Sequence, residues 1–344
     1  MTTKQHPIGS GFTAASTADD VLAGIDLTGT NMIVTGGHVG LGLETTRALS
    51  RAGASVLVGA RNPAGASSRL AGLDHVEVDQ LDLLDPKSID EFASRYVASG
   101  RPLHVLINNA GIMAGPLVRD DRGYESQFAT NHLGHFQLTL ALLPALRAAH
   151  GARVVNLTSG GHRLSDIRWD DPHFTTGYDG MLAYGQSKTA NVLMAVELDR
   201  RWLEYGIHGY AVHPGVIVTT NLGPWLPEGE PRTKWVTDDQ RRAMGLIDES
   251  GNPIINPERE MKTPQQGAST SVWAATSPLL ADVGGVYLKD NDISALGTPR
   301  PINFGAEEDI PATVVPHAID PSSAKRLWDL SERLTTVRSP RYAQ

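Results

Sequence analysis

The chain has 344 residues and a formal net charge of −8 at pH 7, with 38 acidic residues against 30 lysines and arginines. This negative balance disfavours nucleic acid and anionic lipid as partners. The sequence contains no cysteine, which excludes disulfides, thiolate nucleophiles and cysteine-ligated zinc. We find neither a signal-peptide pattern nor an apolar run long enough to span a bilayer, and we therefore expect a cytoplasmic protein with no membrane contact.

Short β-branched runs alternate with longer segments of helical period from Asn31 onward. The preceding residues, 1–28, are polar and weakly periodic, and we interpret them as an N-terminal arm with a short helix near 17–24. Strands are predicted over 32–34, 55–58, 76–78, 104–107, 153–157, 208–212 and 285–288. Helices are predicted over 43–52, 86–98, 125–150, 182–204 and 322–335.

This alternation is typical of right-handed βαβ units. It predicts a three-layer Rossmann fold of the α/β class, with a doubly wound, mostly parallel, seven-stranded sheet in one domain over 29–300. Segment 223–262, which holds Trp225 and Trp235, breaks the rhythm. We interpret it as a substrate lid whose tryptophans either wall an apolar substrate or pack onto the body; a disordered insertion is the alternative.

A Pro-rich tail, 301–344, follows the predicted domain and ends in the helix 322–335. Leu327, Trp328, Leu330 and Leu334 recur at helical spacing in that helix. Such spacing places apolar side chains on one face, and we expect the tail to pack on the domain through this face.

The first predicted strand runs into a glycine-rich turn, TGGHVGLG at 35–42, and a helix follows. Glycines let the backbone approach a pyrophosphate closely, and a helix N-terminus offers unpaired N–H groups. The strand–turn–helix context favours a dinucleotide site over an ordinary tight turn. The cofactor contacts expected from this turn are Gly36, His38, Val39, Gly40 and Leu41.

Arg61 stands at the end of the second strand, where an NAD-binding protein would carry a carboxylate for the ribose 2′-hydroxyl. An arginine there can pair with a 2′-phosphate, so the sequence favours NADP(H) over NAD(H); a solvated surface arginine is the alternative. After the third strand, Asp82 and the adjoining Leu83 are expected at the adenine, where Asp82 can accept from the amino group. Asp82 can equally cap a helix or shape a turn.

Further motifs follow in chain order: NNAG at 108–111, FATNHLGHFQLT around Asn131, VVNLTSGGH around Ser159, YGQSK at 184–188 and HPGVIVTT at 213–220. Together with the glycine turn, this ordered set resembles the short-chain dehydrogenase/reductase family, in its retinol-dehydrogenase-like and WW-domain-oxidoreductase-like branch.

The resemblance implies a catalytic tetrad of Asn131, Ser159, Tyr184 and Lys188. It also implies two cofactor segments. Asn109, Ala110 and Gly111 would lie under the adenosine ribose, and the stretch 214–219 would hold the nicotinamide amide through Pro214, Gly215, Ile217 and Thr219.

Three departures from the family pattern affect these assignments, and one is that segment 223–262 has no pattern that aligns with the family. Ser159 and Tyr184 are 25 positions apart, which leaves a substrate-side insertion over 163–181. Val39 stands where many NADP-using relatives carry a basic residue, so the predicted cofactor preference depends on Arg61.

The Tyr184–Lys188 spacing, i and i+4, places both side chains on one helix face. A free tyrosine titrates near 10, and a neighbouring ammonium lowers that pKa, so Lys188 is expected to tune Tyr184 for proton transfer while also binding the nicotinamide ribose. Ser159 would fix the substrate oxygen, and Asn131 would hold a water that links Lys188 to solvent. An exposed ring beside a solvated amine is the alternative interpretation of the pair.

Three histidines near these motifs need separate interpretations. His132 and His135 have i, i+3 spacing but no accompanying metal-site motif, so we interpret them as polar helix positions and predict no metal. His162 follows Ser159 without a nucleophile-elbow pattern, and we expect it to line the substrate mouth.

The sequence thus predicts an NADP(H)-dependent oxidoreductase that interconverts a ketone or aldehyde and an alcohol of medium size and apolar character. A cofactor-binding sensor or scaffold without turnover is one alternative; an enoyl reductase or epimerase on the same fold is another. Val192, Ala195 and Leu198 form a stripe on the helix 182–204. From this stripe we expect a homodimer or homotetramer packed across a two-fold axis.

Overall fold

A single sheet of eight strands organises the computed structural model, which describes residues 4–220, 222–223, 237–300 and 310–337. The strand order is β3-β2-β1-β4-β5-β6-β7-β8, and every pairing from β3 to β7 is parallel. The strands are β1 (Asn31–Thr35), β2 (Ser55–Ala60), β3 (Val76–Gln80), β4 (Val105–Asn108), β5 (Arg153–Leu157), β6 (His208–His213), β7 (Val286–Lys289) and β8 (Asp292–Ile293). The predicted doubly wound, mostly parallel sheet is confirmed.

The eighth strand is an addition to the seven predicted. β8 is two residues long and pairs antiparallel with β7. Asp290 and Asn291 join the two strands, and both have positive φ, 53° and 61°, as a tight two-residue hairpin turn requires. A strand of two residues has no periodicity to detect, which is why the sequence did not predict it.

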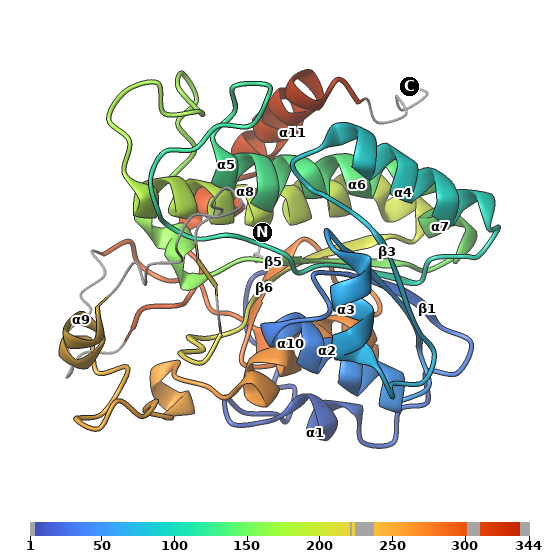
Figure 1. Ribbon diagram of the computed structural model, residues 1–344, viewed down its shortest axis with the longest axis horizontal. Coiled ribbons are helices and arrows are strands. Elements are labelled where there is room, and N and C mark those ends of the chain that lie inside the picture. The colour runs from blue at the N-terminus through green and yellow to red at the C-terminus, as the bar shows by residue number, and fades with distance from the viewer. Residues whose placement is uncertain (1–3, 221, 224–236, 301–309, 338–344) are drawn as a thin grey trace.

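Helices cover both faces of the sheet and give the three layers (Figure 1). One face carries α1 (Ala18–Leu22), α2 (Gly40–Arg51), α3 (Pro63–Leu70) and α10 (Pro264–Thr276). The other carries α4 (Pro86–Ala98), α6 (His135–Ala141), α7 (Leu143–Ala148), α8 (Gly180–Trp202) and α11 (Pro321–Thr335). Two short helices, α5 (Ser126–Phe128) and α9 (Asp238–Ala243), lie in the connections.

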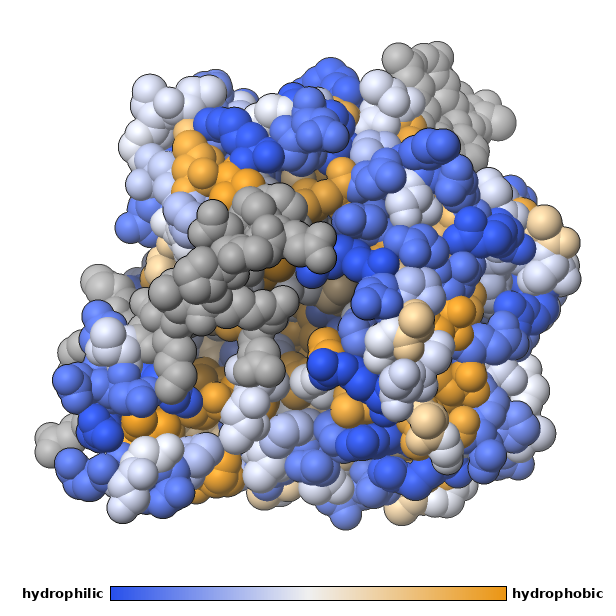
Figure 2. All heavy atoms as spheres, viewed as in Figure 1, coloured by the Kyte–Doolittle hydropathy of each residue, from blue (hydrophilic) through white to orange (hydrophobic). Residues whose placement is uncertain are grey.

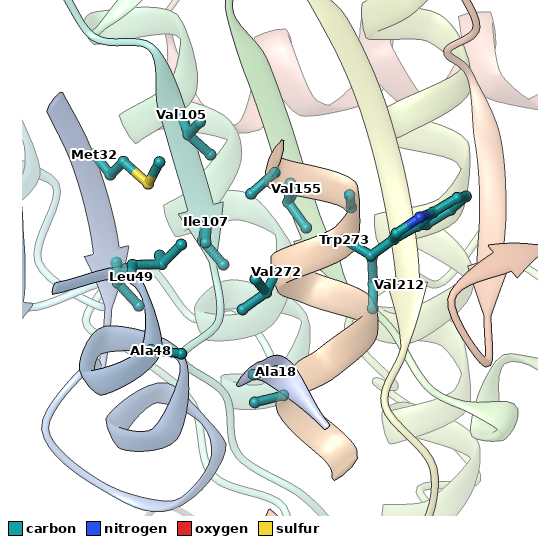
Figure 3. Packing of buried hydrophobic residues seen from close by; sticks show 14 of the residues in the cluster. Ala18, Met32, Ala48, Leu49, Val105, Ile107, Val155, Val212, Val272 and Trp273 are labelled. Atoms are coloured by element: carbon teal, nitrogen blue, oxygen red, sulfur yellow. The ribbon is translucent and has the colours of Figure 1, made fainter. Parts of the chain in front are cut away.

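A hydrophobic core lies on each side of the sheet. Figure 3 shows the first, where Leu49 of α2 and Val272 of α10 lie beside Ile107 of β4. The second contains Leu106 of β4 and Phe136 of α6, both fully buried. The near-continuous Val, Ile and Leu composition of the central strands follows from burial on both faces.

The single helix predicted over 125–150 is wrong. This stretch breaks into α5, a π-helical turn at Ala129–Gly134, α6 and α7. Pro144 lies in the first turn of α7 and cannot continue the hydrogen-bond ladder of a preceding helix. The π-helical turn is of the kind found at functional sites, and it carries Asn131.

The stripe Val192–Ala195–Leu198 of α8 is covered by the chain itself. Val192 and Ala195 pack in one cluster with residues of the 314–318 segment, and Leu198 packs in the cluster that contains Trp328 of α11. The stripe is therefore not available as the subunit interface from which we predicted a homodimer or homotetramer.

The N-terminal arm is docked on the domain, since the Gln5 amide donates to Tyr287 O and Ser294 O at 2.8 and 2.7 Å.

In the part of the chain that the structure describes, no helix is both long and apolar enough to cross a membrane.

We predict that Trp328→Ala lowers the free energy of unfolding by about 3–5 kcal/mol, because it deletes a large side chain from a filled core. Trp328 is 2% exposed and its ring contacts those of Phe136 and Trp202. Denaturant titration measures the change. Leu203→Ala is the control, since Leu203 is 54% exposed and should change stability by less than about 0.5 kcal/mol; equal effects would contradict the prediction.

Candidate active site

The candidate site lies at the carboxyl ends of the strands, where the strand order reverses between β1 and β4. Open α/β sheets bind ligands in the crevice at such a point. The loops after these two strands are joined directly, because the backbone N–H groups of Asn109 and Ala110 both donate to Thr35 Oγ1 at 2.9 Å. The glycine turn and the 108–111 segment are thus brought together as predicted.

The N-terminus of α2 faces this crevice without a capping side chain. Val39 occupies the N-cap position and makes no side-chain hydrogen bond, so the first N–H groups of a 12-residue helix have no side-chain acceptor. Thr220 lies 3.5 Å from the point where a side chain would begin at Gly40. Leu41 and Ile217 both pack on α10 at Gly267, which places the 214–219 loop next to the phosphate turn.

Positive charge gathers beside the same turn. Burial lowers the pKa of His38, and the charges of Arg69 and Arg61 lower it further. The buried Nδ1 of His38 has no hydrogen-bond partner among the described residues. Arg69 lies on α3 and was not predicted from the sequence. It lies on the helix that directly follows Arg61, and this nearness in sequence could have identified it. An uncapped helix, an unpartnered imidazole and two arginines fit a phosphorylated dinucleotide.

Asp82 and Leu83 build the turn after β3. Asp82 Oδ1 accepts from the backbone N–H of Leu84 at 3.0 Å, and Leu83 is buried against Gly134 of the π-helical turn. Asp82 is thus the turn former that the sequence left open as an alternative, and its role toward the adenine stays a prediction.

Tyr184 and Lys188 are buried together in the first half of α8, at 4% and 5% exposure. The Lys188 Nζ lies 5.5 Å from the centre of the Tyr184 ring and donates to Leu157 O at 3.1 Å. It is also 3.6 Å from the point where a side chain would begin at Gly111. The amine therefore lies between the tyrosine and the segment predicted under the ribose, and the exposed-pair interpretation is wrong.

The expected lowering of the Tyr184 pKa by Lys188 is not what the site shows. Burial raises the pKa of Tyr184 to about 12, and only a hydrogen bond with Ser159 acts in the opposite direction. Burial lowers the pKa of Lys188 to about 8. Desolvation disfavours the charged form of each group, so Tyr184 is a phenol at neutral pH.

Ser159 follows β5 and begins the 3₁₀ helix Gly160–Leu164. Its Oγ accepts from the N–H of Gly161 at 3.0 Å, and Ser159 is close enough to Tyr184 to lower its pKa. A Cβ at Gly161 would lie 2.9 Å from the Tyr184 ring, so glycine is required there for Tyr184 to approach Ser159. Gly161 is a second residue that the sequence did not single out.

The Asn131 side chain makes three hydrogen bonds within the protein. Its Oδ1 accepts from Ile112 N, and its Nδ2 donates to Ile112 O and Ser187 Oγ, each at 2.9 Å. Both hydrogens of Nδ2 are used, whereas Oδ1 keeps a second acceptor site, so the water predicted to link Lys188 to solvent stays a prediction. The observed bonds fix the segment after Gly111 to the helix α8. Ser187, inside the YGQSK motif, is a missed member of this arrangement.

His132 and His135 occupy helical positions, as predicted, and both are fully buried. His132 Nε2 bonds Ser331 Oγ of α11 at 2.7 Å, and His135 Nε2 bonds Thr35 Oγ1 at 2.9 Å. His162 does not line the substrate mouth. Its Nδ1 bonds Ser159 O at 2.7 Å, and it lies in the interior, where burial lowers its pKa to about 3. Among the described residues, no three His, Asp or Glu side chains are grouped as metal ligands would be.

The sequence matches the short chain dehydrogenase family over residues 30–228, more than half of the chain. The chain belongs to the short-chain dehydrogenase/reductase family. A probable oxidoreductase of Streptomyces lividans is 42% identical over 312 residues, 89% of this chain and 97% of that protein. Retinol dehydrogenase 12 of Mus musculus is 41% identical over 272 residues, covering 77% and 79% of the two chains. A solved structure of an uncharacterized protein from Mycobacterium paratuberculosis covers 95% of this chain and 100% of its own, with 30% identity and a TM-score of 0.68.

The predicted family and branch are confirmed, and this short-chain dehydrogenase is an oxidoreductase whose family uses a nicotinamide cofactor. Apolar side chains surround the mouth of its site. Leu117, Leu182 and Leu222 are exposed on segments that meet there, since Met113 N donates to Gly223 O at 3.0 Å and the start of α8 packs against Gly115. Figure 2 shows apolar surface on the side of the molecule where α8 begins. Trp225 and Trp235 lie outside the described residues.

Proposed function

We propose that this short-chain dehydrogenase interconverts a ketone or aldehyde and an alcohol by hydride transfer, with Tyr184 as the acid and base and with NADP(H) preferred over NAD(H). The burial of Tyr184 together with Lys188, with the Tyr184 ring packed on Gly161 beside Ser159, is the observation that carries the proposal. The nicotinamide supplies or accepts the hydride when it is bound.

The protein's task is to handle the proton and hold the oxygen. Ser159 donates a hydrogen bond to the substrate oxygen, and Tyr184 gives that oxygen its proton during reduction and takes it back during oxidation. The proton transfer leaves negative charge on a buried phenolate, which is costly unless a cation is close. Lys188 is the cation placed to stabilise it.

The proposed use of NADP(H) favours carbonyl reduction, and the raised pKa of Tyr184 is compatible with that direction. A phenol at neutral pH is the form that donates a proton, whereas oxidation needs the phenolate. A sensor or scaffold that binds the cofactor without turnover would have no need of a buried Tyr–Lys pair, and this disfavours that alternative.

The apolar rim of Leu117, Leu182 and Leu222 supports a medium-sized apolar substrate. We retain segment 223–262 as the proposed substrate lid. The described residues of this segment are 223 and 237–262, and they include α9. The proposed partners are a small-molecule carbonyl or alcohol and other copies of this chain, as a homodimer or homotetramer through a surface other than the α8 stripe. The cytoplasm is the proposed location, because the chain lacks cysteine.

Tyr184→Phe should reduce kcat for carbonyl reduction by at least about a hundredfold, since it removes the proton donor. The NADPH dissociation constant, measured by fluorescence titration, should stay within a few-fold, because the ring and its packing remain. Activity close to wild type in this variant would refute the mechanism.

Arg61→Asp should shift the preference from NADP(H) toward NAD(H), since it replaces a partner of the 2′-phosphate with a carboxylate suited to the 2′-hydroxyl. Arg69→Ala should weaken NADPH binding without improving NADH binding, because it removes positive charge alone. Steady-state kinetics with both cofactors measure the two ratios of kcat/KM. Unchanged ratios in both variants would mean that the basic cluster does not select the cofactor.

The rate of carbonyl reduction should fall as pH rises above about 8. Lys188 has a pKa of about 8, so it is charged below that pH and loses its stabilising charge above it, while Tyr184 remains protonated throughout. The measurement is kcat as a function of pH from about 6 to about 10, an interval that extends well to either side of the Lys188 titration. Lys188→Arg is the companion variant: an arginine stays charged, so any residual activity should show no decline near pH 8. A flat profile in the wild type would contradict the assignment.

A further inference from the structure

A buried set of charged residues lies beneath the turn that carries Ser159. Its centre is Glu260, which is 4% exposed and stands near the end of segment 223–262. His213, the last residue of β6, lies between Glu260 and this turn. The backbone N–H of Gly160 donates to His213 Nδ1 at 3.0 Å, and His213 Nε2 lies 3.1 Å from Glu260 Oε2.

The hydrogen-bond directions in this chain of groups are fixed by the first donor. A backbone N–H can only donate, so His213 Nδ1 is the acceptor and the ring carries its proton on Nε2. Nε2 therefore donates to the Glu260 carboxylate. The hydrogen bonds therefore run in one direction, from Gly160 through His213 to Glu260. The carboxylate determines both the tautomer and the orientation of the ring.

The Glu260 carboxylate is held in its charged form. Burial raises its pKa, but the hydrogen bond from His213 and the ammonium of Lys289 outweigh burial and lower the pKa below its usual range. Lys289 also contacts Asp290, which pairs with the buried Lys262. The carboxylate is therefore a permanent acceptor for His213 at neutral pH.

The backbone of Glu260 is joined to the predicted nicotinamide loop. Val216 N donates to Glu260 O at 2.7 Å, and Lys262 N donates to Val216 O at 3.0 Å. Gly215 has φ of +90°, and a Cβ there would lie 2.8 Å from Glu260 O. Glu260 itself has φ of +70°, which is uncommon for a residue other than glycine and persists where the surroundings enforce it.

We propose that Glu260 and His213 are positioning residues. They couple the stretch 260–262, at the end of segment 223–262, to the geometry of Ser159. Glu260 reaches Ser159 through the His213 ring and the Gly160 amide, and it reaches the 214–219 loop through its own carbonyl. When the carboxylate is lost, the ring loses its orientation and the turn that begins at Gly160 loses its acceptor. The role assigned to Ser159 here rests on the proposed function.

Two variants break the chain of groups at different points. Glu260→Gln keeps the size of the side chain but removes the charge that serves both His213 and Lys289. His213→Asn keeps an acceptor near the Gly160 amide but does not reach Glu260. Since small misplacements of reacting groups cost up to about a hundredfold in rate, both should lower kcat by about tenfold to a hundredfold and change the NADPH dissociation constant by no more than a few-fold.

The matched control is His208→Asn. His208 begins the same strand, β6, is buried, and bonds the buried Asp199 at 2.7 Å, but it lies at the end of the strand away from the site. This variant should lower the melting temperature and leave kcat within about twofold, as expected for a purely structural pair. Equal losses of kcat in His208→Asn and His213→Asn, or an unchanged kcat in His213→Asn, would overturn the proposal.

Hydrogen–deuterium exchange tests the coupling without turnover. In Glu260→Gln the Gly160 amide should exchange at least about tenfold faster, because its acceptor is no longer held in place, although neither Gly160 nor His213 has been changed. Amides at the start of β6 should keep their wild-type rates. An unchanged Gly160 rate would overturn the coupling even if the enzyme is active, and a wild type that reduces no carbonyl would refute the proposed function while leaving this test intact. If Glu260→Gln does not fold, the exchange of Gly161 in His213→Asn serves in its place.

Discussion

The burial of an ammonium beside a phenol is the constraint on which the site depends. Taking a lysine charge out of water costs several kcal/mol unless polar atoms receive its hydrogens, and the Lys188 Nζ donates to Leu157 O. We propose that the ribose hydroxyls of the cofactor, bound near Gly111, complete the hydrogen bonds of this amine. Burial raises the pKa of Tyr184, so a phenolate formed there needs a nearby cation, and we propose that Lys188 stabilises it when the proton leaves.

The rest of the fold keeps these two side chains in place. Asn131 ties the segment after Gly111 to α8, and a π-helical turn presents that asparagine. Behind this turn, His132 bonds Ser331 of α11, so the C-terminal helix supports the catalytic face of the molecule as well as covering α8. From the opposite side, His162 and His213 hold the Ser159 turn. The site is thus braced by segments that lie far apart in the chain.

The sequence predicted what depends on local pattern and could not predict what depends on burial. Seven strands, the glycine turn and the i, i+4 pair followed from periodicity and motif. The direction of the Tyr184 pKa did not, because the sequence shows the neighbouring charge and not the desolvation that outweighs it. The segment 125–150 is divided before Pro144, although its helical period continues across that proline. The α8 stripe was assigned to a partner subunit because nothing local shows that the chain's own tail covers it.

The most direct test of the account is the fate of the hydride. With NADPH carrying deuterium at the transferred position of the nicotinamide, and an apolar ketone as substrate, the alcohol product should carry one deuterium on its carbinol carbon, as detected by NMR. Its hydroxyl proton should come from solvent. An alcohol without deuterium on that carbon, or with deuterium at a neighbouring carbon, would contradict direct transfer to a carbonyl whose oxygen is held by Ser159 and Tyr184.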